Sequence, residues 1–315
     1  MSPPQDKRTW TVGSVLTWAA NDFRKRGRES ARLDAELLLA RALRVDRITL
    51  IIEHQRPLVP QELSDYRALI QRRRNAEPIA YILGFREFYG HEFNVDPRVL
   101  IPRPDTETLV ETALRRVDTE NSVRALDLCT GSGCVAISLQ LARASWNIVA
   151  SDQSEGAVEV ARANAAKLKV ADTLDVVQSD LFSSVPQHLF HLITANPPYI
   201  PDGEVAELQP DVREYEPHLA LKGGQDGLNL VRSLLEQARE YLAPSGILAL
   251  EVGHDQASKV GELLASFGYG KIELDQDYAG IERVVSAVWD PTPATTSPTE
   301  PGSVASVEHA TTTAL

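Results

Sequence analysis

The sequence predicts an α/β protein in which a small helical region precedes a larger domain built on a mostly parallel sheet. Two patterns support this prediction. Before Glu77 the apolar residues repeat at the spacing of helices, whereas from Val123 onward strand-like and helix-like stretches alternate. Such alternation implies right-handed crossovers, with helices on both faces of the sheet.

Helical spacing marks the first part of the chain. Apolar residues recur in this way within residues 15–23, 33–42 and 63–74, so we expect a helix in each. A bend at Glu77-Pro78 should follow the third helix. We therefore predict that residues 1–84 form a helical N-terminal domain.

Aromatic residues and prolines dominate the next stretch. The segment REFYGHEFNV (86–95) holds two short aromatic-rich runs around Gly90, which is the pattern of a β-hairpin. The segment IPRP (101–104) cannot be regular structure, because two prolines fix the backbone. Residues 85–104 are therefore predicted to form a hairpin and a linker.

Residues 105–290 are predicted to form the α/β domain. It should open with a helix over 106–117, with Asp105 or Thr106 as its N-cap. The strand-like runs that follow are 124–129, 147–152, 174–180, 191–196, 246–253, 271–277 and 283–289. Helix-like stretches between them include 155–168, 228–242 and 256–267. The last two strands have a short connection, so one should run antiparallel. Residues 291–315 are rich in Pro, Ser and Thr without aromatic residues, and predict a disordered tail.

Composition favours a cytoplasmic protein without tight nucleic-acid binding. The formal net charge is -12, although residues 1–100 hold 17 Lys/Arg against 13 Asp/Glu, a net of +4. An acidic chain is a poor partner for phosphates, which need clustered cations. No apolar run approaches the roughly 20 residues that span a bilayer. The N-terminus MSPPQDKRTW lacks the apolar core of a signal peptide. We expect a monomer with no membrane attachment.

The two cysteines do not predict a metal site. Cys129 and Cys134 lie across a strand-to-helix turn, and no other cysteine could complete a thiolate site. We interpret both as buried small residues rather than as a redox pair.

A glycine-rich loop in LDLCTGSGCVA (126–136) predicts a site for an adenosine-type cofactor. Gly131 and Gly133 allow a sharp turn and close approach of a ligand, and the following helix offers free N–H groups. Asp152 ends the next strand, where its carboxylate suits two ribose hydroxyls. From the loop alone a nicotinamide dehydrogenase, a methyltransferase and a structural turn all stay open, because Ala136 completes the dinucleotide pattern G-x-G-x-x-A.

Asp127 favours the methyltransferase. It precedes the glycines inside a strand, where a buried acid is costly unless it meets a cation or fixed N–H donors. S-adenosylmethionine carries a cationic amino group and a sulfonium, whereas the pyrophosphate of a dinucleotide is negative and would be repelled.

The tetrapeptide Asn196-Pro197-Pro198-Tyr199 is the strongest chemical signal. Prolines have no N–H to donate, so the local carbonyls should face outward as acceptors beside the side-chain carbonyl of Asn196. Together they can hold both hydrogens of an NH2 group, and Tyr199 offers a flat face for a planar substrate. A plain proline-rich turn is the competing interpretation. The position after the fourth strand from the glycine loop, on the same edge of the sheet, disfavours it.

This arrangement suits the methylation of a planar amide. A carboxamide nitrogen is a weak nucleophile because its lone pair is delocalised. Two acceptors that hold its hydrogens orient the nitrogen and stabilise the positive charge that develops as it attacks a methyl group. An in-line transfer of this kind requires neither a metal ion nor a covalent intermediate.

Several segments resemble a known family. LDLCTGSGCVAISLQLA, the Ser-Asp pair at 179–180, NPPYI and the closing ERVVSAVW are similar to amino-methyltransferases with an [ND]PP[YF] motif. The segment EPIAYILGFREFYGHEFNVDPRVLIPRPDTETLVE (77–111) closely resembles the release factor glutamine methyltransferases. The resemblance covers about residues 10–289. It implies a class I methyltransferase fold, with a Rossmann-like sheet, a small helical N-terminal domain and a linking hairpin.

The resemblance also implies an activity and a site. S-adenosyl-L-methionine would be the methyl donor, and the substrate would be the Gln side chain in the Gly-Gly-Gln motif of peptide chain release factors, docked against both domains. Carried over by position, the cofactor-binding residues are Asp127, Cys129, Thr130, Gly131, Ser132, Gly133, Asp152, Asp180, Leu181 and Asn196. The substrate-binding residues are Arg103 and Asn196, Pro197, Pro198 and Tyr199, with Asn196, Pro197 and Tyr199 catalytic.

The chain departs from the family's pattern at two positions. Many members have Gly where this chain has Cys129, and an aromatic residue where it has Leu181. A leucine can still cover an adenine face by apolar contact, with less stacking. The later glycines remain, so the first departure should matter little.

Four other functions compete. The nearest is methylation of a ribosomal-protein glutamine, which the IPRPDTE segment disfavours. A nucleic-acid methyltransferase would receive a flipped base at the NPPY motif, but the acidic domain lacks a basic stripe. A dinucleotide dehydrogenase would have no use for NPPY. The intact Asn196 and both loop glycines oppose a non-catalytic cofactor-binding scaffold.

Overall fold

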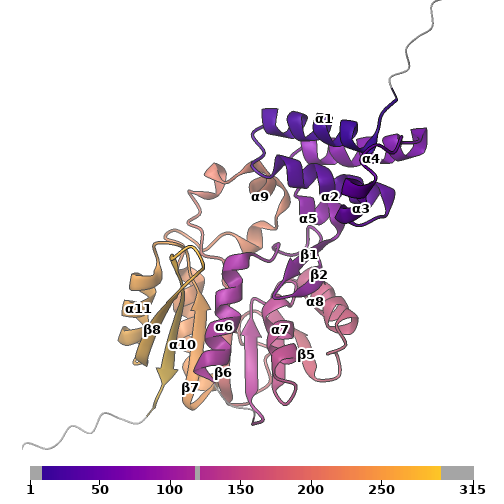
Figure 1. Cartoon of the computed structure of the whole chain (residues 1–315). Helices are drawn as coiled ribbons and strands as arrows, with labels where there is room; N and C mark the ends of the chain where they lie inside the picture. Colours follow the sequence, from indigo (N-terminus) through magenta and orange to yellow (C-terminus); the bar gives the residue numbers. More distant parts are fainter. Residues whose placement is uncertain (1–8, 118–120, 292–315) are drawn as a thin grey trace, which may run out of the picture.

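The computed structural model describes residues 9–117 and 121–291. A group of helices from the N-terminal part of the chain lies above one end of an α/β unit (Figure 1). A two-stranded hairpin connects the two parts, at the end of the sheet where the strands point toward the helices. Of the predicted disordered tail, 291–315, only Pro291 lies within the described residues.

Five helices form the N-terminal part. They are α1 (Val12–Lys25), α2 (Ala31–Leu43), α3 (Arg47–Ile52), α4 (Pro60–Arg74) and α5 (Ile79–Leu83). The three predicted helices are α1, α2 and α4. Thr11 and Ser14 form a reciprocal capping box that begins α1, and Pro60 begins α4, where its missing N–H costs nothing. The short helices α3 and α5 were not predicted, because neither is long enough to show a helical period.

The predicted hairpin is present and packs into the main core. Strands β1 (Phe85–Phe88) and β2 (His91–Asn94) pair antiparallel around Gly90. The side chains of Phe88 and Phe93 are 2% and 0% exposed and belong to the hydrophobic cluster of the large sheet. The hairpin is therefore a part of the α/β core as well as a connector.

The prolines after the hairpin differ from expectation. Pro104 begins the short 3-10 helix η1 (Pro104–Thr106), so the segment IPRP is not wholly irregular. Proline suits this first position because its fixed φ matches a helical turn. Helix α6 (Glu107–Arg116) follows, with Thr106 at the N-cap position but without a side-chain capping hydrogen bond.

Seven strands form the large sheet, in the order β5-β4-β3-β6-β7-β9-β8. They are β3 (Arg124–Leu128), β4 (Asn147–Asp152), β5 (Leu174–Gln178), β6 (Phe190–Ala195), β7 (Leu242–Glu251), β8 (Gly270–Gln276) and β9 (Glu282–Trp289). The strands from β5 to β7 pair in parallel, and β9 runs antiparallel to both of its neighbours. The predicted mostly parallel sheet and its antiparallel strand are both confirmed.

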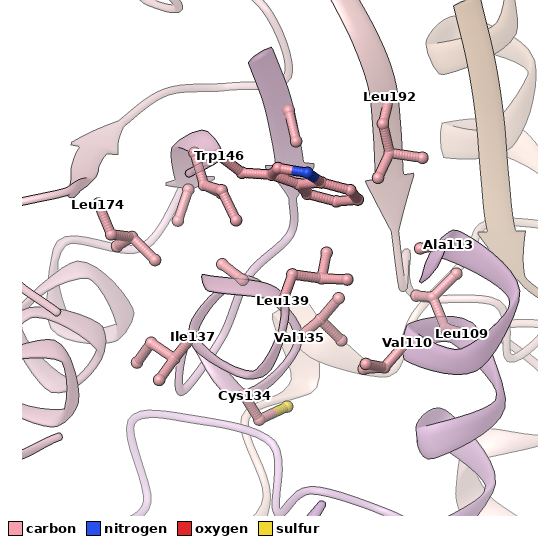
Figure 2. Packing of buried hydrophobic residues seen from close by; sticks show 14 of the residues in the cluster. Leu109, Val110, Ala113, Cys134, Val135, Ile137, Leu139, Trp146, Leu174 and Leu192 are labelled. Carbon is pink, nitrogen blue, oxygen red and sulfur yellow. The ribbon is translucent and has the colours of Figure 1, made fainter. Parts of the chain in front are cut away.

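Helices cover both faces of this sheet. Helix α6, helix α7 (Cys134–Ala142) and helix α8 (Glu155–Lys167) share one hydrophobic cluster. Trp146, which is 1% exposed, is among the largest fully buried side chains and lies beside Leu139 and Leu192 (Figure 2). Helix α10 (Asn229–Tyr241) and helix α11 (Ala257–Ser266) bury their apolar faces in a second cluster.

A segment between β6 and β7 reaches back to the N-terminal helices. It contains η2 (Val205–Glu207), α9 (Pro210–Tyr215) and η3 (His218–Ala220), none of which was predicted. The Tyr215 hydroxyl donates to the Asn75 carbonyl at 2.7 Å, and Arg73 on α4 contacts Asp211 on α9 at 3.3 Å. This segment, 200–222, therefore connects the end of the fourth parallel strand with the helical part of the chain. None of the helices in the described ranges is long and apolar enough to span a membrane.

Candidate active site

The glycine loop turns sharply between β3 and α7. Cys129, Gly131 and Gly133 have φ values of 56°, 55° and 81°, all in the left-handed region that favours glycine. A Cβ on Gly133 would lie 2.9 Å from Cδ1 of Ile137, so a side chain there would displace the helix packing. Cys129 has this positive φ although it carries a side chain. The positive φ is the structural reason why glycine would suit the position.

Both cysteines are free thiols. Cys134 is buried, as expected, and burial raises its pKa to about 12. Cys129 is only half-buried, because it lies at the cavity described below. Burial raises the pKa of the Cys129 thiol as well, so neither residue has the thiolate character of a redox centre.

Asp127 anchors the loop from inside the sheet. It is 1% exposed, and its two carboxylate oxygens accept hydrogen bonds from the hydroxyls of Thr130 at 2.6 Å and Thr194 at 2.7 Å. Burial raises its pKa to about 6, although these two hydroxyls lower it. We expected a cation or N–H donors to compensate this acid. The Ala136 N–H stabilises its charged form, but the two hydroxyl groups contribute more. Through Thr130 the carboxylate also holds the loop in place.

Asp152 holds the loop from the neighbouring strand. Its Oδ2 accepts from the backbone N–H of Gly131 and its Oδ1 from that of Ser154, both at 2.9 Å. Burial raises its pKa, while these N–H groups stabilise the charged form. Each carboxylate oxygen keeps a further lone pair, so the side chain can still accept two hydroxyl hydrogen bonds.

A cavity of about 420 Å³ opens at the carboxyl ends of β3, β4 and β6. This is where the strand order reverses between β3 and β6, the usual ligand position in such sheets. The predicted site residues that line it are Arg103, Asp127, Cys129, Thr130, Gly131, Ser132, Asp152, Asp180, Leu181, Asn196 and Pro198. Gly133, Pro197 and Tyr199 do not line the cavity.

The cavity fits an adenosine-type cofactor. Its volume lies in the range of small-molecule sites. Ser132 lines the cavity, and its buried hydroxyl lies close enough to the Cys134 thiol to lower the pKa of that thiol. Leu181 lies on the cavity wall with φ 46°, held by a hydrogen bond of 2.8 Å from the Ser179 hydroxyl to its carbonyl. Asp180 is exposed at the same wall.

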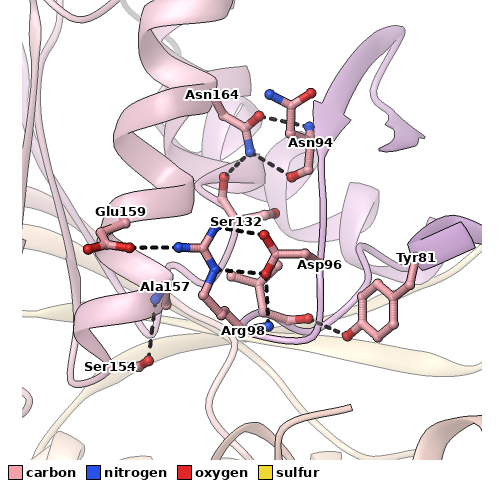
Figure 3. Close-up of polar contacts among 10 residues, drawn as sticks. Tyr81, Asn94, Asp96, Arg98, Ser132, Ser154, Ala157, Glu159 and Asn164 are labelled. Carbon is pink, nitrogen blue, oxygen red and sulfur yellow. Dashed lines mark hydrogen bonds and ion pairs between the residues drawn. The ribbon is translucent and has the colours of Figure 1, made fainter. Parts of the chain in front are cut away.

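The linker after the hairpin forms another wall of the cavity. Asn164 of α8 donates to the carbonyls of Ser132 and Asn94 and accepts from the Asn94 N–H, joining the glycine loop to β2 (Figure 3). Arg98 pairs with Asp96 and Glu159, at 2.7 and 2.6 Å (Figure 3). These contacts place the linker against the cavity, where Arg98, Val99, Leu100, Pro102 and Arg103 line it; of these residues, the sequence had predicted only Arg103 at the site.

Arg103 faces this cavity, but its guanidinium is already paired. It donates to Oε1 of Glu216 at 2.5 Å, and Oε2 of Glu216 accepts from the Ile101 N–H at 3.1 Å. Glu216, whose side chain is 1% exposed, thereby connects the linker to the segment 200–222. The substrate-binding role predicted for Arg103 stays a prediction.

The NPPY motif lies at the end of β6, beside the same cavity. The Asn196 amide donates to the Thr106 hydroxyl at 3.3 Å. The Tyr199 carbonyl accepts from Gln256 Nε2 at 2.9 Å, so one of the carbonyls expected to be open is occupied. No hydrogen bond within the described part of the chain reaches the Pro197 carbonyl.

Three residues near this motif were missed at the level of sequence. Thr106 was considered only as a helix cap, Gln256 is the N-cap residue before α11, and Glu251 ends β7. The Tyr199 hydroxyl lies 3.5 Å from Oε1 of Glu251. Of these three residues, only Thr106 could have been suspected from the sequence, because it lies in the segment IPRPDTE that resembles the family. The stacking role predicted for Tyr199 stays a prediction.

Comparison with known proteins identifies the family. A model described as the PrmC N-terminal domain matches residues 14–84, and the methyltransferase small domain matches residues 105–209. A release factor glutamine methyltransferase of Geobacter sulfurreducens is 43% identical over 88% of this chain and 96% of its own length. One of Rhodopirellula baltica is 38% identical over 91% of this chain and 99% of its own length.

The chain belongs to the release factor glutamine methyltransferase family. Among solved structures, the hMettl16 catalytic domain in complex with an RNA hairpin covers 75% of this chain and 85% of its own, with a TM-score of 0.52. At 14% identity this likeness shows the fold alone. The resemblance to this family, the class I methyltransferase fold and the seven-stranded sheet are thus confirmed.

Proposed function

We propose that the protein transfers the methyl group of S-adenosyl-L-methionine to the side-chain amide nitrogen of a glutamine in a peptide chain release factor. The observation that carries the proposal is the position of Asn196. Its amide lies on the wall of a cavity whose other walls are the glycine loop and Asp152. A cofactor and an amide substrate can therefore meet at one point.

The glycine loop and Asp152 would hold the cofactor. When bound, S-adenosyl-L-methionine supplies an activated methyl group on a sulfonium. The free lone pairs of Asp152 would accept from the ribose hydroxyls. Leu181 supplies an apolar surface for a flat base. Asp127 acts indirectly, through the Thr130 hydroxyl that it holds.

Asn196 and Pro197 would hold the reacting amide. The Asn196 NH2 donates to Thr106, which leaves its carbonyl oxygen able to accept from the substrate NH2. The Pro197 carbonyl supplies a second acceptor. Two acceptors orient the nitrogen for in-line attack and stabilise the charge that it gains. The reaction needs no metal ion, because the sulfonium of S-adenosyl-L-methionine already activates the methyl group.

The finer assignment concerns the glutamine itself. The best-supported substrate is the Gln of the Gly-Gly-Gln motif in release factors, because 88% and 91% of the chain match relatives that are named for release factor methylation. Flanking glycines would let the backbone enter the narrow space between the linker and segment 200–222. We further propose that the enzyme works as a monomer in the cytoplasm, with no direct contact to nucleic acid.

One experiment tests the proposal. The purified protein is incubated with radiolabelled S-adenosyl-L-methionine and either a purified release factor or ribosomal proteins, and labelled peptides are mapped. We expect label on one glutamine of the release factor. A release factor whose Gly-Gly-Gln glutamine is replaced by asparagine should take up no label. Label found only on ribosomal proteins would refute the substrate assignment.

A further inference from the structure

Glu251 is a buried carboxylate for which the reaction described above gives no role. It is the last residue of β7 and is 1% exposed. In the parallel ladder between β6 and β7, Ala195 pairs with Leu250. The next residues along the two strands are Asn196 and Glu251, so both lie at the carboxyl edge of the sheet, beside each other.

The polar groups of the NPPY motif surround this carboxylate. Its Oε1 lies 3.5 Å from the Tyr199 hydroxyl, and the Thr106 hydroxyl and the Asn196 amide both stabilise its charged form. Its Oε2 has no hydrogen-bond partner within the described residues. Burial raises the pKa of Tyr199, so its hydroxyl keeps its proton and can donate.

The other charged and titratable groups near Glu251 come from three further elements. Arg283 on β9 lowers the pKa of Glu251, and Asp105 in η1 raises it. Arg283 is itself held by Asp277 at 3.0 Å and by Asp105 at 3.3 Å, so it does not pair with Glu251 directly. The Cys134 thiol on α7 is also near enough that the charge of Glu251 raises the pKa of the thiol. The Tyr199 hydroxyl is the nearest donor to this carboxylate, and Thr106 and Asn196 lie close enough to lower its pKa.

A buried carboxylate with an unused oxygen is costly to keep. We propose that Glu251 is a positioning residue, which holds the NH2 of Asn196 and the hydroxyl of Tyr199 so that Asn196 presents its carbonyl oxygen to the substrate nitrogen. This inference rests on the proposed function, in which that oxygen accepts from the substrate amide.

The need for such a residue follows from the symmetry of an amide. The two ends of the Asn side chain have nearly the same shape, but one end accepts and the other donates. A flipped Asn196 would point NH2 at NH2, and the substrate nitrogen would lose an acceptor. Thr106 alone does not decide the orientation, because a hydroxyl both donates and accepts. An ionised carboxylate only accepts, so it fixes the NH2 end beside itself.

Protonation of Glu251 should therefore weaken the orientation. Burial raises its pKa to about 7. Below that pH the carboxyl carries a donor and tolerates either end of the Asn196 amide. In the wild-type enzyme kcat should rise through this range as pH increases.

The test is the isosteric variant Glu251→Gln in the full-length enzyme. Gln keeps the shape but brings its own NH2 and cannot ionise. We expect kcat for the release factor to fall at least tenfold at pH 8, with its rise near pH 7 lost. The KM for release factor and the calorimetric Kd for S-adenosyl-L-methionine should stay within about twofold. Glu251→Asp, which restores an anion at shorter reach, should recover part of kcat. A kcat and pH profile like those of wild type in Glu251→Gln would overturn the proposal.

A second measurement needs no substrate turnover. In protein labelled with 15N-asparagine, the side-chain NH2 signals of Asn196 should shift with pH near 7 in wild type and not in Glu251→Gln. Identical titrations in both proteins would contradict the inference even if methylation of release factors failed. Ser286→Ala serves as a matched control, because Ser286 is a buried polar residue of the same sheet, opposite Ala249, away from the motif. It should leave kcat and the Asn196 signals unchanged.

Discussion

Asp152 shows how one side chain serves both the loop and its ligand. Its two oxygens already accept from the N–H groups of Gly131 and Ser154. The same carboxylate therefore shapes the glycine loop before any cofactor arrives. A substitution here removes ligand contacts and also loosens the loop, so the two effects must be measured separately.

Asp152→Ala is expected to weaken S-adenosyl-L-methionine binding at least tenfold. Each hydrogen bond to a charged acceptor contributes roughly 1.5–3 kcal/mol. Titration calorimetry measures the affinity, and thermal unfolding separates loss of binding from loss of the fold. Asp175→Ala, which changes an exposed acid on the neighbouring strand, is the matched control. An unchanged affinity in Asp152→Ala would remove the ribose assignment.

Asn196→Ala should lower kcat on the order of 100- to 1000-fold, by analogy with the removal of one oxyanion-hole donor. The Kd for the cofactor should change little. Asn196→Asp keeps an acceptor but places a second carboxylate beside Glu251, and like charges repel, so we expect partial activity. Single-turnover assays measure the chemical step. Equal rates for Asn196→Ala and wild type would show that the motif does not hold the substrate amide.

The sequence revealed some of these residues and concealed others. Asp152 and Asn196 could be predicted, because each follows a strand within a recognisable local pattern. Glu251 could not be predicted, since an acid at the end of an apolar strand has no meaning until the register of β6 against β7 is known. The same holds for Gln256, whose contact with the Tyr199 carbonyl joins residues far apart in the chain.

At the scale of the elements, the turn before α10 packs closely against the backbone of the NPPY motif. Gly223 and Gly227 bring their backbone close to this motif: a Cβ on Gly223 would lie 2.7 Å from the Pro198 carbonyl oxygen. A Cβ on Gly227 would lie 2.2 Å from that of Tyr199. These glycines were not recognised at the level of sequence. A close approach between two loops leaves no periodic signal, and the short helices of segment 200–222 have none either.

Gly227→Ala should lower kcat at least tenfold, because the new methyl group displaces the Tyr199 carbonyl and the Gln256 side chain. Gly280→Ala is the control, since Gly280 has nearly the same φ, 79° against 78°, but no atom near its Cβ. Both variants should lose about 1–2 kcal/mol of unfolding free energy from the left-handed backbone, and Gly227→Ala should lose more, because its Cβ also meets the Tyr199 carbonyl. Only Gly227→Ala should lose activity in the methylation assay. Equal activity of the two variants would show that this contact does not position the motif.

At the scale of the whole molecule, the hydrophobic core of the α/β part includes residues that precede the strand–helix pattern in the sequence. The strand–helix pattern starts at Val123, yet the hairpin residues Phe88 and Phe93 belong to the core of the large sheet. The Tyr81 hydroxyl also donates to the Val99 carbonyl at 2.6 Å, within the linker that lines the cavity. A cut at residue 100 would therefore remove part of the hydrophobic core. The domain boundaries that we predicted stay a proposal.

Two fragments test this division. A protein of residues 77–291 keeps the hairpin and α5, and we expect it to bind S-adenosyl-L-methionine but not to methylate intact release factor. A protein of residues 101–291 lacks Phe88 and Phe93 and should be less stable by several kcal/mol, as expected for the loss of two buried aromatic side chains. Calorimetry, chemical denaturation and the methylation assay measure these outcomes. Full activity of the 77–291 fragment would refute a substrate-docking role for the helical part.

The linker wall of the cavity has a thermodynamic consequence. Because most residues of the linker segment 98–103 line the space that the cofactor would fill, a bound cofactor also holds the linker in place. At a free concentration 100 times its Kd, a ligand stabilises the state that binds it by about 2.7 kcal/mol. Hydrogen exchange of linker amides that open independently of global unfolding should slow about a hundredfold on saturation. Coupling of this kind is reciprocal. A release factor that displaces the linker as it docks would therefore lower the affinity for the cofactor by the same factor as the cofactor lowers the affinity for that release factor, and so favour release of the spent cofactor while the polypeptide is still bound.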